Sequence, residues 1–119
     1  MADAREALRI FSTELGQDHP NVAHAEARIG AILLDSGRAG DALPHLERSL
    51  QIRRTRVGDQ MLLGQSELFV ARALIAAGRS PDRALGLAEA ARERFRGAGE
   101  EAEPYLEEVD AFLRNELGG

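Results

Sequence analysis

The chain has 119 residues, enough for one domain, and it contains no cysteine. Disulfides, thiolate zinc sites and cysteine nucleophiles are therefore excluded. Apolar residues make up 44% of the chain and aromatic residues only 4%, a composition that favours packed helices. The net charge of −5 is concentrated in residues 100–119, which argues against binding to a phosphate backbone, since that requires a basic face.

All 15 basic residues are arginine, which suggests a GC-rich bacterial source. No apolar run approaches the roughly 20 residues that span a bilayer. The first residues lack the charged and apolar regions of a signal peptide. We therefore expect a soluble cytoplasmic protein.

Glycines divide the chain into amphipathic stretches, each ending where a left-handed C-terminal cap is expected. These glycines are Gly16, Gly37, Gly58, Gly78 and Gly97. Ser80 followed by Pro81 resembles a cap residue before a first-turn proline. No convincing alternating segment is present, so no sheet is expected. The sequence predicts helices over residues 3–15, 20–36, 39–57, 61–77, 81–96 and about 101–117.

The chain contains an internal repeat with an offset of 42 residues. Ala42-Leu43 recurs as Ala84-Leu85, and Gly37-Arg38 recurs as Gly78-Arg79 after a one-residue slip. Short connections predict that successive helices pack as antiparallel hairpins. Small residues such as Gly30 lie on the apolar stripe of helix 20–36, where they allow a neighbouring helix to approach closely.

This arrangement resembles a tetratricopeptide repeat (TPR), and in particular the longer 42-residue variant of kinesin light chains and many bacterial regulatory proteins. The resemblance is carried by His19-Pro20-Asn21-Val22-Ala23, Gly30, Leu33, Gly37-Arg38, Ala42, Leu50, Ile52 and Val57-Gly58. It implies an all-α domain over residues 1–119, stacked as a short right-handed superhelix. Residues 3–15 would be a half repeat, 20–57 and 61–96 two repeats, and 101–117 a capping helix. Glu26 and Glu67 stand where the family usually has a bulky apolar residue.

The resemblance also implies a function. TPR arrays bind a peptide or protein domain on the concave wall formed by the first helix of each pair. The groove-facing positions expected here are His24, Ala27, Ala31, Leu34, Asp35, Gln65, Leu68, Arg72, Ile75 and Ala76. The favoured hypothesis is a non-catalytic interaction module with a protein partner.

No motif for catalysis, metal or cofactor binding is present. His19, His24 and His45 have no carboxylate at a spacing that completes a metal site. The acidic residues after residue 100 fit a solvated helix face better than acid–base catalysis. A phosphate-binding loop and a nucleophile elbow are both missing. We therefore expect no cofactor, no nucleic acid and no membrane partner.

An alternative hypothesis is self-assembly within a larger bacterial regulatory protein. Helix 3–15 carries a possible dimer face of Leu8, Phe11 and Leu15, and it would lack the helix that precedes it in a full repeat. An uncovered apolar patch favours a homodimer. An enzyme or nucleic-acid-binding domain remains a reserve hypothesis, which a ligand pocket containing His24, Asp35 and Arg72 would revive.

Overall fold

The computed structural model of the protein describes residues 19–55 and 59–115. Its helices in chain order are α2 (Pro20–Asp35), α3 (Ala39–Thr55), α4 (Gln60–Ala76), α5 (Pro81–Ala98), a short 3₁₀ turn η1 (Glu100–Ala102) and α6 (Glu103–Asn115). The all-α prediction is confirmed, and each α-helix begins and ends within two residues of its expected bounds. The expected helix over residues 3–15, with Gly16, and the expected cap at Gly58 lie outside the described residues.

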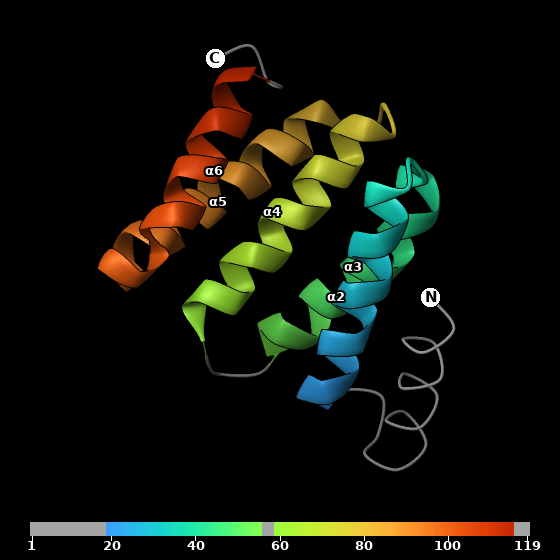
Figure 1. Ribbon diagram of the computed structural model, residues 1–119, viewed down its shortest axis with the longest axis horizontal. Coiled ribbons are helices and arrows are strands. Elements are labelled where there is room, and N and C mark those ends of the chain that lie inside the picture. Colours follow the sequence, from blue (N-terminus) through green and yellow to red (C-terminus); the bar gives the residue numbers. More distant parts are fainter. Residues whose placement is uncertain (1–18, 56–58, 116–119) are drawn as a thin grey trace. The chain divides into compact units, whose positions relative to one another are not determined.

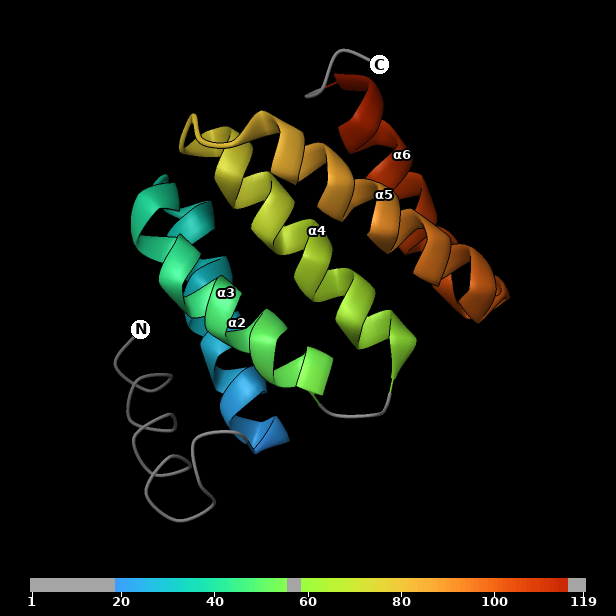
Figure 2. The same ribbon diagram turned by 180° about the vertical axis from the view of Figure 1, so that it is seen from behind.

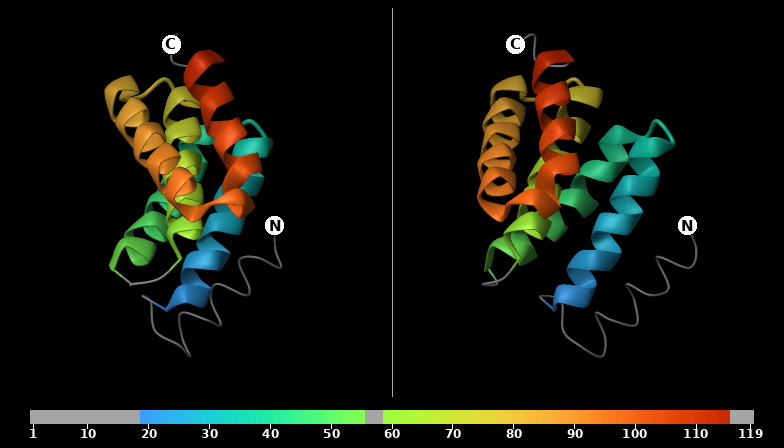
Figure 3. Two further views of the ribbon diagram at one scale, coloured as in Figure 1. Left: turned by 90° about the vertical axis from the view of Figure 1, so that its left-hand side faces the viewer. Right: turned by 60° about the vertical axis from the view of Figure 1, so that its left-hand side comes forward.

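The chain divides into two compact units, Met1–Val57 and Gly58–Gly119. In the first unit α2 and α3 form an antiparallel hairpin (Figures 1 and 2). In the second unit α4 and α5 form another hairpin, and α6 packs mainly on α5 (Figure 3). The predicted pairing of successive helices as hairpins is therefore confirmed within each unit.

The two hairpins turn in the same way. After α2, Gly37 has a φ of 78°, Arg38 N–H donates to the Leu33 carbonyl at 2.8 Å, and Gly37 N–H donates to the Leu34 carbonyl at 3.1 Å. After α4, Gly78 has a φ of 69° and the same two hydrogen bonds form: Arg79 N–H donates to the Leu74 carbonyl, and Gly78 N–H donates to the Ile75 carbonyl. Both turns are Schellman motifs, in which glycine takes the left-handed conformation without steric cost. The predicted glycine caps are confirmed at these two positions.

Of two predictions about the ends of α5, one is wrong and the other is confirmed in part. Gly97 lies inside the helix, and the glycine with a positive φ (84°) is Gly99, which follows the last helical residue. Ser80 is the N-cap residue and Pro81 lies in the first turn, as predicted, but the φ of Ser80 is 44°, in the left-handed region, and its side chain makes no capping hydrogen bond. The left-handed backbone of Ser80 is not the extended conformation from which an N-cap hydroxyl reaches the first amides.

In the core of each unit, a glycine allows two helices to approach each other closely. A Cβ at Gly30 would lie 2.5 Å from two side-chain carbons of Leu46, so α2 and α3 approach through this glycine as the sequence predicted. In the second unit, a Cβ at Gly64 would lie 2.8 Å from the Phe95 ring. That ring stacks on Tyr105 with centroids 5.6 Å apart, which joins α5 to α6.

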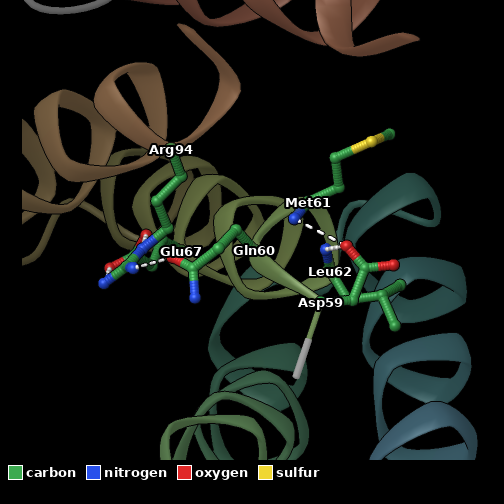
Figure 4. A network of polar contacts seen from close by, with 6 residues as sticks. All are labelled: Asp59, Gln60, Met61, Leu62, Glu67 and Arg94. Carbon is green, nitrogen blue, oxygen red and sulfur yellow. Dashed lines mark hydrogen bonds and ion pairs between the residues drawn. The ribbon is translucent and has the colours of Figure 1, made fainter. Parts of the chain in front are cut away.

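Asp59 caps α4, because its carboxylate accepts hydrogen bonds from the N–H groups of Met61 at 2.8 Å and Leu62 at 3.4 Å (Figure 4). Replacing Asp59 with alanine is expected to lower the free energy of unfolding by about 1 kcal/mol, since these first-turn donors lose their acceptor. Urea unfolding followed by far-ultraviolet circular dichroism measures the change. Asp59→Asn keeps an acceptor oxygen and serves as control; an equal loss in both variants would contradict this explanation.

Candidate functional site

The predicted groove residues of α2 share one accessible stripe of the first unit. His24 and Asp35 are exposed, and Ala27, Ala31 and Leu34 are partly exposed. Their spacing of three and four residues places them on one side of the helix. This stripe combines a small apolar floor with a histidine and a carboxylate near its two ends.

The predicted groove residues of α4 are accessible with one exception. Gln65, Arg72 and Ile75 are partly exposed and Ala76 is exposed, whereas Leu68 is only 4% exposed. The neighbouring Phe69 is partly exposed instead, and the Arg72 guanidinium carbon lies 5.7 Å from the centre of its ring. We define the α4 face by its accessible members: Gln65, Phe69, Arg72, Ile75 and Ala76.

Arg72 is held in place from two sides. Its Nη1 donates to Glu108 Oε1 at 3.1 Å, so α6 contributes a carboxylate to the α4 face. Contact with Phe69 adds a cation–π attraction. The sequence interpretation missed both partners: Glu108 was assigned to a solvated acidic face, and Phe69 is recognisable only from its spacing of three residues before Arg72.

The same helix carries a second polar network on its other side. Glu67 is 1% exposed, and Arg94 of α5 donates to it through Nε at 2.7 Å and Nη2 at 3.5 Å (Figure 4). Arg94 Nη1 also donates to Gln60 Oε1 at 2.6 Å. A buried carboxylate needs this kind of charged partner, because desolvation alone makes it costly.

Glu26 makes the corresponding pair in the first unit. It is 8% exposed and its Oε1 lies 3.0 Å from Nδ1 of His45 on α3. Glu26 and Glu67, which stand where the family usually has an apolar residue, are therefore both buried. Each pairs with a histidine or arginine side chain on the second helix of its hairpin. These pairs link the two helices of each hairpin. None of their residues belongs to the accessible stripe of α2 or to the α4 face.

The histidines are placed separately. His19 Nδ1 accepts a hydrogen bond from Asn21 N–H at 3.0 Å and so caps α2, while His24 is exposed and His45 pairs with Glu26. Within residues 19–55 and 59–115, no group of three or more histidine, aspartate or glutamate side chains is placed to hold a metal ion.

Residues 2–55 match the family model of the tetratricopeptide repeat. The match includes the hairpin of α2 and α3, with its glycine turn and the Gly30 approach. TPR proteins in general are non-enzymatic repeat scaffolds that mediate protein–protein interaction. No curated protein and no solved structure matches the chain.

The described helices include none that is long and apolar enough to cross a membrane. The possible dimer face of Leu8, Phe11 and Leu15 lies outside the described residues. The accessible surfaces of α2 and α4, by contrast, lie within the described residues.

Proposed function

We propose that this chain is a TPR protein that acts as a non-catalytic interaction module, binding a segment of another protein on the first helix of each hairpin. The observation that carries the proposal is the family match over residues 2–55. Features of that segment recur in the second unit: Gly78 repeats the turn at Gly37, and Glu67 repeats the buried acid at Glu26. Both of these pairs are 41 residues apart, and Ala42 and Ala84 are 42 residues apart. Offsets of this length favour the longer kinesin-light-chain type of repeat.

The composition of the accessible surfaces supports a peptide or protein ligand. On the α4 face, Phe69, Ile75 and Ala76 offer apolar contact, while Gln65 and Arg72 offer hydrogen-bond donors. Interfaces favour this mixture of an aromatic residue and an arginine over lysine and glutamate. Because Glu108 and Phe69 already hold Arg72, its side chain loses less rotamer freedom on binding.

The test begins with partners that co-purify with the tagged chain from its source cells and are identified by mass spectrometry. Calorimetry with an identified partner then compares the wild type with the double variant Arg72→Ser/Ile75→Ser. We expect binding to weaken by about tenfold or more, since an anchor arginine and an apolar contact are both removed. Circular dichroism checks that helicity is unchanged.

A matched double variant on α5 controls for the loss of one arginine and one aliphatic residue. Arg96 and Leu85 are exposed on that helix, and Arg96→Ser/Leu85→Ser is expected to bind as the wild type does. Equal affinity in the α4 variant and the wild type would move the binding site away from the α4 face.

A further inference from the structure

A cleft opens in the second unit on the side of the hairpin where Arg94 lies. Its volume is about 520 Å³, and it is lined by Gln60 of α4 and by Ala90, Glu93, Arg94, Gly97 and Ala98 of α5. None of these residues belongs to the α4 face. The volume lies in the range of sites that take a small molecule or a few peptide residues. We call this site the Arg94 cleft.

Much of the lining consists of residues with a single methyl group or none. Ala90, Gly97 and Ala98 contribute little side chain, and a Cβ placed on Gly97 would meet no atom within 4 Å. Gly97 has ordinary helical backbone, so neither a turn nor packing inside the unit requires glycine there. A main chain can therefore approach α5 closely at this point.

Arg94 is fixed within this lining by three hydrogen bonds. Glu67 and Gln60, seven residues apart on α4, accept from Nε, Nη2 and Nη1 (Figure 4). The buried Glu67 carboxylate holds the guanidinium on its protein-facing side, while the Arg94 side chain remains 30% exposed to solvent. The planar fork is thus oriented before any ligand arrives, which lowers the entropy cost of binding.

The remaining donors define the ligand chemistry. Arginine has five N–H donors, and the three hydrogen bonds leave one N–H on each of Nη1 and Nη2. Gln60, whose oxygen accepts from Arg94, keeps its amide N–H donors. Because Glu67 neutralises the guanidinium at 2.7 Å, neutral carbonyl oxygens suit these donors better than a free anion.

Glu93 adds the one exposed carboxylate of the cleft. Its side chain is 75% exposed, and its contact with Arg96 is a long 3.4 Å pair between exposed groups, which contributes little. A cationic side chain next to the bound carbonyl groups could form an ion pair with the Glu93 carboxylate. A peptide that carries a lysine or arginine next to the anchored main chain therefore satisfies every polar group of the lining.

We propose that the Arg94 cleft is a second binding site, which takes a short extended peptide segment with its main-chain carbonyls on Arg94 and Gln60 and a basic side chain on Glu93. It is independent of the proposed function of the α4 face, because the two sites share no residue.

The probe is the peptide acetyl-Ala-Lys-Ala-amide, titrated into the isotope-labelled full chain and followed by two-dimensional NMR. We expect the amide signals of Gln60, Ala90, Gly97 and Ala98 to shift. We also expect acetyl-Ala-Glu-Ala-amide to bind about tenfold more weakly, because its charge is repelled by Glu93. Absence of shifts at the cleft residues with the lysine peptide overturns the proposal.

Two glycine variants on α5 separate the cleft from the rest of the surface. Gly97→Leu fills the cleft and should abolish the shifts, while Gly86→Leu, at another helical glycine with no atom within 4 Å of its Cβ, should leave them. Leucine favours helix at both positions, so neither variant is expected to unfold α5. Unchanged affinity in Gly97→Leu, or an equal loss in both variants, contradicts the assignment.

Discussion

Replacing Arg94 with alanine is expected to lower the free energy of unfolding by about 3 kcal/mol, because the buried Glu67 carboxylate loses the guanidinium opposite it. The side chain of Glu67 is 2% exposed, so water cannot replace the lost hydrogen bonds. Because Arg94 itself is 30% exposed, the expected loss lies at the low end of the range for broken buried pairs. Urea unfolding followed by far-ultraviolet circular dichroism gives the difference.

The control removes both charges at once. In Glu67→Met/Arg94→Met two flexible apolar side chains fill the same space, and we expect its stability to lie within about 1 kcal/mol of the wild type. The single variant should therefore be less stable than the double variant. If Arg94→Ala costs less than about 1 kcal/mol, the pair behaves like an exposed salt bridge and Glu67 is not as desolvated as its burial indicates.

Glycine spacing and small-residue positions were sufficient to predict the described helices and the turns at Gly37 and Gly78. Gly37 and Gly78 follow amphipathic stretches and are followed by Arg38 and Arg79, whose N–H groups complete the same turn. These are local features, since a Schellman motif depends on residues close in sequence. The cap at Gly97 was mispredicted because Gly99 follows two residues later, and sequence alone does not decide which glycine ends a helix.

The polar pairs could not be predicted in the same way. Glu26 and Glu67 occupy corresponding positions in the two hairpins, yet Glu26 pairs with a histidine 19 residues later and Glu67 with an arginine 27 residues later. The partner of a buried acid depends on how two helices are aligned along each other, which helical periodicity does not specify. The α4 face shows the same limit, because Phe69, rather than Leu68, is the accessible residue beside Arg72.

The second large effect is expected in the first unit, where Gly30→Ala should lower the free energy of unfolding by about 2 kcal/mol. The new Cβ would lie 2.5 Å from Cγ and Cδ2 of Leu46, and Leu46 is 1% exposed, so its side chain has no open space into which to move. The backbone carbonyl of Ala42 lies 3.4 Å from the same point. The two helices would therefore have to separate, and alanine's better helix propensity, worth about 1 kcal/mol, does not compensate.

Gly86→Ala is the matched control, and its expected effect has the opposite sign. Gly86 also lies inside a helix, but a Cβ there would meet no atom within 4 Å, so the gain in helix propensity should raise the free energy of unfolding by about 0.5–1 kcal/mol. Thermal and urea unfolding of both variants measure the contrast. Stabilisation by Gly30→Ala would show that Leu46 can adopt another rotamer, and that α2 and α3 do not depend on this glycine for their approach.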